Sequence, residues 1–573
     1  MKIILRYLRE FYGRMSIGLI IKIIGTLAEL MLPYILSHIL ANVMGSGVGD
    51  ILFWGGLMIL CSAIAWLFNI IANRMAAKIS KRFSENMRKD LFVKTLRLSA
   101  AQTDKFTIPS LESRITTDTY NVLNFVNRMQ RLGVRAPILL LGGIIMTLFM
   151  DAHLALIMIA MIPIVLVIVI FIKTKGIPLY AKVQRSVDGM VRVVREDIQG
   201  IRVIKALSKT DYEHGRYDKV NRALSNDEIH AGVITGTVNP IMTMFMNMGS
   251  VCVIALGAVR VSKGLSNPET VIAFIQYFTL ISNALLSVTR MFVMFTKCAA
   301  SSKRIEEVFD AEEEICIEAK ELYPDKETKA HVVFDNVSFS YNGKHNDVEH
   351  IQFELPKGGS LGIIGATGSG KSTVIRLLLR FYDVTEGNIY INGENIRTIP
   401  KERFYKMFGS ALQFDFLYAD TIEENICFGR EISHEDVVRA AKIAQADEFI
   451  TAFADGYGHK LTSHGTNISG GQKQRVLISR ALASNPDILI LDDSSSALDY
   501  KTDAALRTAL REYMTDTTVI TVAQRVSSVK NCDLILVLDE GKIIGMGTHD
   551  ALLETCAEYR EISESQMGGA FVE

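Results

Sequence analysis

The residues best suited to chemistry form one Gly-rich pattern in the last third of this 573-residue chain, Gly365-Ala366-Thr367-Gly368-Ser369-Gly370-Lys371-Ser372. Glycines at these spacings let the backbone wrap around phosphates, so that its N–H groups point inward at a helix N-terminus that favours anions. Lys371 supplies a positive charge to the outer phosphates, and Ser372 offers a hydroxyl to Mg²⁺. The pattern predicts a nucleotide site with the contacts Gly365, Thr367, Gly368, Ser369, Gly370, Lys371, Ser372 and Thr373.

Two predicted strands position this site. Ser360–Ile364 is typical of a buried strand that enters the loop, and Val374–Leu379 of the helix that leaves it, which is the context that makes the pattern credible. Ile488–Leu491 places four aliphatic residues in a row, as in a buried parallel strand. Asp492 follows at the carboxyl end of that strand, where its carboxylate can hold Mg²⁺ directly or through water.

A second short motif, Ile468-Ser469-Gly470-Gly471-Gln472, lies between the Gly-rich loop and the aliphatic strand and opens a helical run from Lys473 to Ala483. A serine and two glycines at a helix start form another nest of backbone N–H groups that faces an anion. An ordinary helix cap after a flexible turn would give the same residues. The position of the motif just before the aliphatic strand favours the anion-facing interpretation.

The first three hundred residues hold six apolar stretches long enough to cross a bilayer at about 20 residues each. These predicted spans are 16–44, 51–74, 133–150, 152–172, 232–260 and 268–296. The segments 75–132 and 173–231 are rich in Lys and Arg, whereas the loops 45–50 and 151–152 contain neither. The positive-inside rule therefore predicts a multi-pass protein with both long segments and both chain ends in the cytoplasm.

Glu29 is an ionisable residue deep in the first predicted span. Such groups usually face a cavity or a partner inside the bundle. Glu29 is therefore a candidate substrate contact, and a structural hydrogen bond to a neighbouring helix is the alternative.

Composition limits the function further. The formal net charge is zero and no basic stretch carries interleaved aromatic residues, so nothing points to nucleic-acid binding. The seven cysteines are scattered, which argues against a disulfide framework or a zinc site. We predict a transmembrane domain at 1–309, an acidic linker at 310–330 and a nucleotide-binding domain at 331–573.

With both motifs and six spans, the whole chain resembles a half-size ABC exporter, and its signature motif differs from the usual one only at Ile468. The resemblance implies an all-α six-helix transmembrane domain fused to an α/β P-loop, RecA-like domain with a helical subdomain. It also implies that two ATP molecules and Mg²⁺ lie between two such domains. The Gly-rich loop of one domain, which is called Walker A in this family, then faces Ser469, Gly470, Gly471 and Gln472 of the other domain. A second half-transporter is therefore needed.

The resemblance assigns further roles residue by residue. Tyr341 matches the aromatic residue that stacks on adenine, and Gln413 matches the glutamine that contacts Mg²⁺ and the attacking water. Asp499 ends the D-loop Ser496-Ala497-Leu498-Asp499, which lies across the dimer interface in this family. The segments Gln102–Leu111 and Lys209–Tyr217 match the cytoplasmic helices that dock on the ATPase domains.

Three positions depart from the family. Asp493 stands where the catalytic glutamate is usual, which retracts the carboxylate by about 1–1.5 Å, a misplacement that can cost roughly 10²-fold in rate. Gln524 replaces the switch histidine and cannot become cationic. Ser463-His464 replaces a usual Glu-Arg pair before the signature. The chain therefore resembles the degenerate-site subunit of bacterial heterodimeric multidrug exporters.

The sequence thus favours ATP-driven efflux of amphipathic or hydrophobic small molecules across a bacterial cytoplasmic membrane, in contact with membrane lipid, with a heterodimer favoured over a homodimer. A lipid or peptide exporter and an ATP-gated regulatory or channel-like ABC protein are the alternatives. Neither the cargo nor the partner can be identified from these residues.

Overall fold

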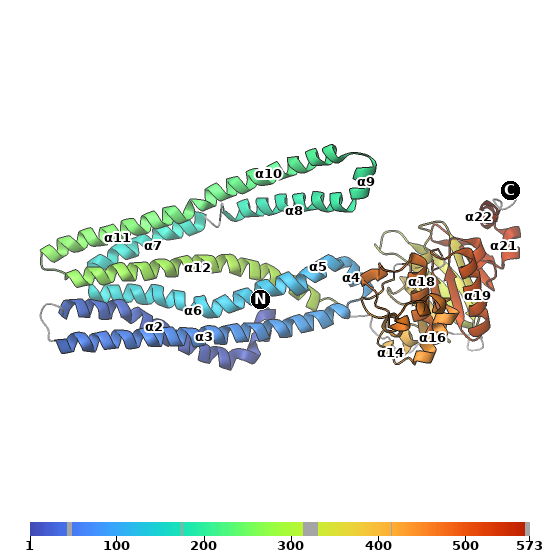
Figure 1. Cartoon of the computed structure of the whole chain (residues 1–573), viewed down its shortest axis with the longest axis horizontal. Helices are drawn as coiled ribbons and strands as arrows, with labels where there is room; N and C mark the ends of the chain where they lie inside the picture. The colour runs from blue at the N-terminus through green and yellow to red at the C-terminus, as the bar shows by residue number, and fades with distance from the viewer. Residues whose placement is uncertain are drawn as a thin grey trace. The chain divides into compact units, whose positions relative to one another are not determined.

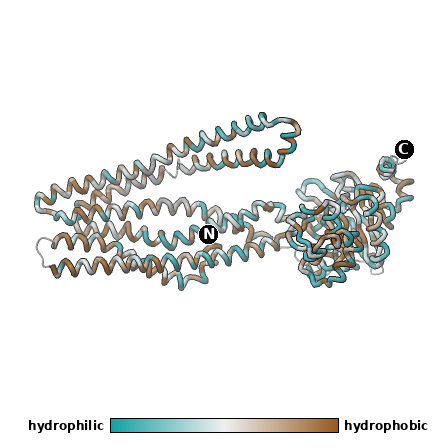
Figure 2. The backbone as a smooth tube through the Cα atoms, in the orientation of Figure 1, coloured by the Kyte–Doolittle hydropathy of each residue, from teal (hydrophilic) through white to brown (hydrophobic). Residues whose placement is uncertain are grey.

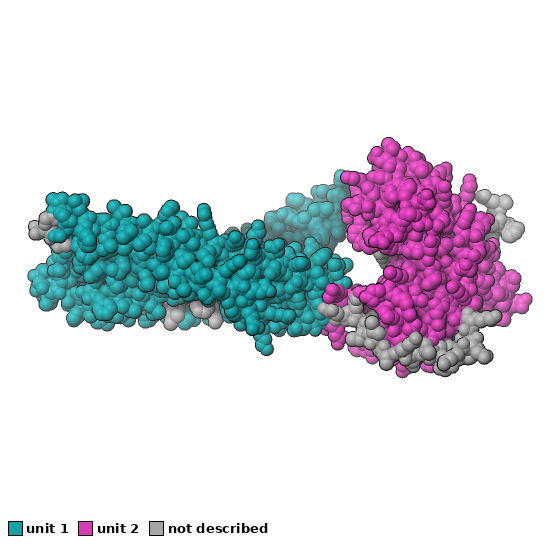
Figure 3. Space-filling view, turned by 90° about the horizontal axis from the view of Figure 1, so that it is seen from below, with its two compact units in different colours: residues 1–96, 108–311 teal, residues 97–107, 312–573 magenta. Residues whose placement is uncertain are grey.

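The computed structural model describes residues 1–42, 48–171, 174, 176–312, 330–413, 415–494 and 496–567. The chain divides into two compact units, which Figure 3 distinguishes by colour. The helical unit comprises Met1–Leu96 and Ile108–Ala311, and the ATPase unit comprises Arg97–Thr107 and Glu312–Glu573. Most of the predicted linker lies outside the described residues, so the predicted boundaries at 309 and 331 stay predictions.

The described residues of the helical unit form helices and short connections between them (Figure 1). The elements are α1 (Lys2–Leu8), η1 (Arg9–Phe11), α2 (Tyr12–Asn42), α3 (Val48–Leu96), α5 (Ile108–Ser113), the π-helical turn η2 (Arg114–Asp118), α6 (Thr119–Met150), α7 (Ala152–Phe171), α8 (Ile177–Gln199), α9 (Ile201–Ala206), α10 (Thr210–Gly236), α11 (Val238–Ser262) and α12 (Pro268–Phe309).

Five helical stretches among the described residues are long and apolar enough to cross a membrane, judged by length and composition. They are Lys2–Ala41, Val48–Leu96, Ile108–Met150, Thr210–Ser262 and Pro268–Val288. A shorter apolar helix, Ala152–Met161, falls on the fourth predicted span. The count of six spans therefore stays a prediction.

The helices α8 and α10 form a long antiparallel hairpin with α9 at its tip (Figure 1). Asp227 of α10 holds the hairpin together, because it accepts from Lys182 Nζ at 2.6 Å and from Ser186 Oγ at 2.7 Å. Figure 2 shows hydrophobic residues concentrated along α7 and α11, whereas hydrophilic residues recur along α8 and α10. This polarity fits a membrane-embedded base and a hydrated tip.

Asp151 fixes the tight turn between α6 and α7. Its Oδ1 accepts from the backbone N–H of His153 at 3.0 Å, and its Oδ2 accepts from Arg260 Nε at 3.0 Å. Burial alone would raise the pKa of Asp151, but these donors outweigh burial and hold the pKa below its ordinary value. Arg260 thus neutralises the buried carboxylate of the turn.

The ATPase unit contains two sheets. Its strands are β1 (Ala330–Phe339), β2 (Val348–Pro356), β3 (Ser360–Gly365), β4 (Glu386–Ile391), β5 (Glu394–Asn395), β6 (Phe408–Ala411), β7 (Ile488–Asp492), β8 (Thr518–Val522), β9 (Leu534–Asp539) and β10 (Lys542–Gly547). Its helices are α4 (Ala100–Phe106), α13 (Lys371–Leu378), α14 (Lys401–Phe404), α15 (Ile422–Cys427), α16 (His434–Ile443), α17 (Asp447–Thr451), α18 (Gly470–Leu482), α19 (Tyr500–Tyr513), α20 (Val526–Val529), α21 (His549–Thr555) and α22 (Ala557–Met567), with 3₁₀ turns η4 (Tyr405–Met407), η5 (Gly456–Gly458) and η6 (Ser463–Gly465).

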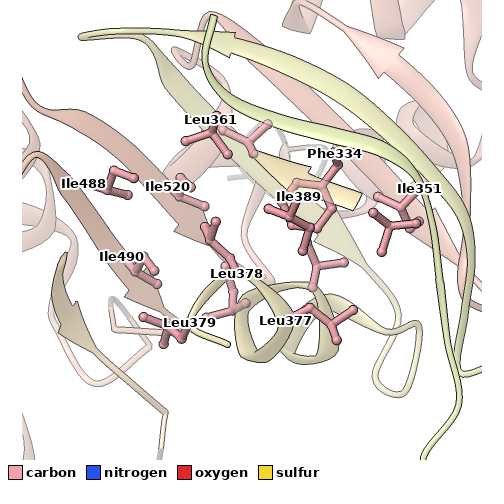
Figure 4. Close-up of a cluster of buried hydrophobic side chains, with 14 of the residues drawn as sticks. Phe334, Ile351, Leu361, Leu377, Leu378, Leu379, Ile389, Ile488, Ile490 and Ile520 are labelled. Atoms are coloured by element: carbon pink, nitrogen blue, oxygen red, sulfur yellow. The ribbon is translucent and has the colours of Figure 1, made fainter. Parts of the chain in front are cut away.

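The larger sheet has the order β10-β9-β3-β8-β7-β6, in which all neighbours are parallel except the edge pair of β10 and β9. The smaller, antiparallel sheet has the order β2-β1-β4-β5. Helix α13 packs its apolar face into the core between the sheets, and Figure 4 shows Leu377, Leu378 and Leu379 beside side chains from both. All five residues of β7 are buried, as the aliphatic run predicts. The structure confirms the predicted fold class, a helical membrane domain joined to an α/β P-loop domain.

Candidate nucleotide-binding site

The site lies where several parallel strands of the larger sheet end. β3 leads into the Gly-rich loop, β7 into Asp493, β8 toward Gln524 and β6 toward Gln413. Because the carboxyl ends of parallel strands meet at one edge of a sheet, these groups converge although they are far apart in the sequence. They line one cavity of about 210 Å³ together with Lys371, Ser372 and Asp492.

The Gly-rich loop depends on two glycines in the left-handed region, Gly368 at φ 88° and Gly370 at φ 96°. A Cβ on Gly370 would approach the Val348 side chain to 2.8 Å, so a larger residue would strain this turn as well. Lys371 Nζ donates to the carbonyls of Gly365 at 2.8 Å and Ala366 at 2.6 Å. Burial lowers the pKa of Lys371, and the nearby aspartates oppose that effect. The loop thus holds the Lys371 ammonium group against two backbone carbonyls, where phosphate oxygens could take the place of those carbonyls as acceptors.

The two aspartates after β7 differ in environment. Asp492 is buried and hydrogen-bonded to Ser372, and its pKa is raised mainly by burial. Asp493 is half-buried in the left-handed region at φ 50°, which a short Asp tolerates better than most residues. Its Oδ2 accepts from Gln524 Nε2 at 3.1 Å and, at the outer limit, from Gln413 Nε2 at 3.5 Å. Burial is also the main reason that the pKa of Asp493 is raised.

The donor set fits a hard divalent cation. The Ser372 hydroxyl, the Asp492 carboxylate and the Gln413 side chain all line the cavity, and oxygen ligands of these kinds are the ones that Mg²⁺ accepts. The glycines, Lys371 and the N-terminus of α13 supply the groups that favour a phosphate chain.

Tyr341 lies beside this cavity and is tied to α13. Its hydroxyl donates to Thr373 Oγ1 at 3.4 Å and accepts from Arg376 Nη1 at 3.2 Å. Its ring packs edge-on against Phe339 and Tyr382. These contacts orient the ring next to the phosphate loop, and the role of Tyr341 in adenine stacking stays a prediction.

The signature motif is outside this cavity, since none of Ser469–Gln472 is among its described lining residues. Ser469 instead caps α18 in a reciprocal pair: its Oγ accepts from Gln472 N at 3.2 Å, and Gln472 Oε1 accepts from Ser469 N at 2.9 Å. Gly471 packs against the D-loop, because a Cβ there would lie 3.1 Å from the Ala497 carbonyl oxygen. Asp499 caps α19 by accepting from Thr502 N at 2.8 Å.

Gln566 makes contacts near the site that carried no signal in the sequence. Gln566 of α22 donates through Nε2 to the Gln524 carbonyl at 2.9 Å and accepts through Oε1 from Val526 N at 2.8 Å. This side chain therefore brackets the backbone on both sides of Arg525. His464, one of the predicted departures, has φ 64° and packs edge-on against Phe416.

The first predicted docking segment, Gln102–Leu111, belongs to the ATPase unit up to Thr107 and to the helical unit from Ile108 onward. The Asp104 carboxylate accepts a hydrogen bond from the Tyr382 hydroxyl, and Thr103, Asp104, Phe381 and Phe404 line a cavity of about 350 Å³ beside α4. Docking of the part of Gln102–Leu111 that lies in α4 is thus confirmed. The segment Lys209–Tyr217 begins α10 in the helical unit, and its docking stays a prediction.

Glu29 lies in α2 and pairs with Arg135 of α6, whose Nε donates to Glu29 Oε2 at 3.1 Å. The alternative of a structural bond between helices is therefore present. The substrate role of Glu29 stays a prediction. Arg135 was missed as its partner because 106 residues separate the two.

The fold and this site define a class of protein: a membrane protein of long apolar helices that carries its own P-loop ATPase unit. A family model described as ABC transporter transmembrane region matches residues 15–285, and one described as ABC transporter matches residues 348–496. The chain therefore belongs to the ABC transporter family, as a half-size exporter that binds and hydrolyses ATP.

Individual relatives agree with this membership. The chain is 31% identical over 573 residues to an uncharacterized ABC transporter ATP-binding protein of Mycobacterium tuberculosis, across 99% of this chain and 98% of the relative. It is 32% identical over 567 residues to the uncharacterized ABC transporter ATP-binding protein YfiB of Bacillus subtilis, across 98% of both. A solved structure of a bacterial Atm1-family ABC exporter with ATP bound matches with a TM-score of 0.80 at 24% identity over 98% of both chains, which shows the shared fold.

Proposed function

We propose that this chain is the degenerate-site half of a heterodimeric efflux pump. The observation that carries the proposal is the pairing of Asp493 with Gln524 in one cavity. The carboxylate of Asp493 is one methylene shorter than a glutamate, and it is held by amide donors. A carboxylate that is retracted by about 1–1.5 Å and turned toward Gln524 is poorly placed to polarise an attacking water.

Gln524 adds to this effect. Its amide can donate one hydrogen bond to a phosphate oxygen but cannot supply the positive charge of a protonated histidine. In the described geometry its Nε2 donates to Asp493. We infer that the chain's own site holds ATP and hydrolyses it slowly, with Gln413, Asp493 and Gln524 as its weak catalytic set.

Nucleotide binding at this site does not depend on Asp493 or Gln524. Lys371, the loop N–H groups and Thr373 would hold the phosphates, and Tyr341 would stack on adenine. Ser372, Asp492 and Gln413 would hold Mg²⁺, which supplies charge neutralisation of the phosphate chain when bound. The site therefore retains its affinity for nucleotide while losing rate.

The signature half of the chain supports a different site. The N–H groups of Gly470 and Gly471 begin α18 and precede any acceptor within the helix, and a Cβ on Gly470 would meet nothing within 4 Å. We infer that Ser469, Gly470, Gly471 and Gln472, with Asp499 across the interface, complete a fast site on a partner half-transporter that carries the usual glutamate and histidine.

Closure of the two ATPase domains around ATP would then drive the membrane helices from an inward-facing to an outward-facing state. The apolar surface at the tip of the α8–α10 hairpin suits docking on the partner, because Ile198, Val203, Leu207 and Tyr212 are all exposed by 61% or more. We propose that the cargo is an amphipathic or hydrophobic small molecule, and that the pump lies in a bacterial cytoplasmic membrane with both chain ends inside.

Two substitutions in this one chain test the proposal. In the purified complex, Asp493→Asn should change ATP turnover by less than about twofold, because the slow site contributes little. Ser469→Arg should lower turnover by about 10²-fold, because it blocks the anion-facing groups of the fast site.

A homodimer would behave differently, since both of its sites would contain Asp493 and both substitutions would then be equally severe. That result, or native mass spectrometry that finds two copies of this chain in a fully active complex, would contradict the proposal.

ATP-dependent uptake into inverted vesicles, compared with single-channel current in planar bilayers, distinguishes a pump from an ATP-gated pore.

A further inference from the structure

A cluster of basic side chains joins three helices of the membrane unit. Lys22 of α2 is only 3% exposed, and its Nζ donates to Asn69 Oδ1 at 2.6 Å and to Asn73 Oδ1 at 3.1 Å, both in α3. These acceptors are neutral amides, so they solvate the ammonium group but do not balance its charge. A lysine that is almost fully buried without a counter-ion among its direct partners is costly.

Arginines on α6 add to this charge. Arg128, Arg131 and Arg135 recur at spacings of three and four residues, which places them on one face of the helix. The charges of Arg131 and Arg135 and the carboxylate of Glu29 are close enough to act on Lys22. The cluster therefore combines cations from α2 and α6.

Among the residues that the structure describes, Glu29 is the one carboxylate whose charge acts on Lys22, and it already has an ion-pair partner. Glu29 is 18% exposed at its side chain and pairs with Arg135. Arg128 and Arg131 are exposed, and neither makes an ion pair or a hydrogen bond with the residues that the structure describes. The cluster is thus short of negative charge in the part of the chain that the structure describes.

The level of the cluster in the bundle suits an amphipathic ligand. Lys22 lies six residues inside the first predicted span, or about 9 Å along the helix, and Arg128 and Arg131 directly precede the third span, at 133–150. Above Arg131 on the same face of α6 lie Ile138, which is partly exposed, and Ile145, which is 51% exposed. Exposed basic residues on this face of α6 are thus followed, further along the helix, by apolar residues.

We propose that the exposed Arg128 and Arg131, with the buried charge of Lys22 adding to their field, bind the anionic group, a carboxylate or phosphate, of an amphipathic cargo whose apolar part lies along Ile138 and Ile145. The Glu29–Arg135 pair closes the upper end of the site and keeps Arg135 from competing for the ligand. This inference rests on the proposed efflux function and narrows its cargo class from amphipathic molecules in general to amphipathic anions.

Two amphiphiles with the same tail and opposite charge test the site. The full transporter complex is placed in nanodiscs of zwitterionic phosphatidylcholine, and ATPase stimulation and equilibrium binding are measured with dodecyl phosphate and with dodecyltrimethylammonium, both below the concentrations at which they form micelles. We expect dodecyl phosphate to bind and stimulate at concentrations about tenfold lower than dodecyltrimethylammonium. Equal responses to the two amphiphiles would overturn the proposal.

Variants test whether dodecyl phosphate binds at Arg128 and Arg131. Arg131→Gln combined with Arg128→Gln should raise the dodecyl phosphate concentration for half-maximal binding about tenfold and leave dodecyltrimethylammonium unchanged. Arg74→Gln is the matched control, because Arg74 is an exposed arginine of α3 and lies about 100° around the helix from Asn73. Arg74→Gln should change neither value. A double variant that binds dodecyl phosphate as the wild type does would overturn the proposal.

A lipid headgroup carries the same anionic chemistry, so a second arm replaces phosphatidylcholine with phosphatidylglycerol. Binding of dodecyl phosphate that persists in these nanodiscs supports a cargo site. Loss of that binding in the wild type would assign the cluster to bilayer lipid and overturn the cargo assignment. Because binding is measured without ATP, these outcomes are independent of whether the complex is a heterodimer with one slow site.

Discussion

Removal of the Asp118 carboxylate should destabilise the helical unit far more than loss of an exposed ion pair. Asp118 is fully buried at the start of α6, where its Oδ1 accepts from Ser301 Oγ at 2.7 Å and its Oδ2 accepts from Arg304 Nε at 2.8 Å. Both donors belong to α12. The carboxylate therefore joins the π-helical turn before α6 to the last helix of the unit.

The expected magnitude follows from burial. Breaking a fully buried ion pair by removal of one partner costs about 3–5 kcal/mol. The Arg304 side chain is 50% exposed and regains water when it loses its partner, so we expect about 2–3 kcal/mol for Asp118→Ala. The control is Glu196→Ala: Glu196 is 47% exposed and pairs with Arg216, which is 41% exposed, and loss of such a pair costs about 1 kcal/mol or less.

Tryptophan fluorescence reports this unfolding selectively. The chain has two tryptophans, Trp54 and Trp66, and both lie in α3 of the helical unit. At a fixed scan rate in one detergent, Asp118→Ala should lower the apparent Tm by roughly 3–5 °C, since an unfolding entropy of about 2.1 cal/mol/K per residue gives about 1.6 °C per kcal/mol for the roughly 300 residues of the helical unit. Asp118→Asn, which keeps acceptor oxygen but no charge, should fall between Asp118→Ala and the wild type. A Tm for Asp118→Ala equal to that of Glu196→Ala would refute the reasoning.

Three further predictions concern the turn, the switch and the docking helix. Because the pKa of Asp151 is lowered in the folded protein, its contribution to stability is complete above its unfolded pKa of about 3.9 and is lost as pH falls through the lower folded value. The Tm should therefore depend less on pH below about 4 in Asp151→Asn than in the wild type, as measured by thermal melting at a series of acid pH values. Gln566→Met removes two hydrogen bonds to the backbone on either side of Arg525. The loss of about 1 kcal/mol should weaken ATP photolabelling of this chain about fivefold. Gln566→Asn should weaken it as well, because the shorter side chain cannot reach both backbone groups. Tyr382→Phe removes the bond to Asp104 and should lower cargo-stimulated ATPase activity more than basal activity, and equal losses in both would argue against a coupling role.

Local patterns were sufficient for the parts of the site that belong to one strand and its following loop. The strand before the Gly-rich loop, the buried aliphatic strand and the helix after the signature all lie where the sequence predicts them, because burial and glycine spacing act within a few residues. The convergence of Gln413, Asp493 and Gln524 was predicted from the family resemblance, and the strand order now gives its physical reason.

Contacts between distant segments were not predictable from such patterns. Arg135 reaches Glu29 only because α2 and α6 pack together, and Gln566 reaches the switch only because α22 returns to α20. Glu29 and Arg135 lie within predicted spans and Gln566 within a polar helix pattern, and none of these patterns identifies a partner. Their partners are decided by helix packing, which no local periodicity encodes.

The position of the signature supports the proposal that a second chain completes the site at the phosphate loop. The sheet edge collects Lys371, Asp492, Asp493 and Gln524 around one cavity, whereas Ser469 begins a helix that is fixed elsewhere by its own cap and by Gly471 against the D-loop. Moving Ser469 to the phosphates would require breaking this cap, which costs about 1 kcal/mol, and the Gly471 packing as well. Approach of a second chain requires neither. In the proposed dimer, two chains that each present a loop and a signature would form two sites, and weakening the catalytic groups at one loop would leave the other site intact.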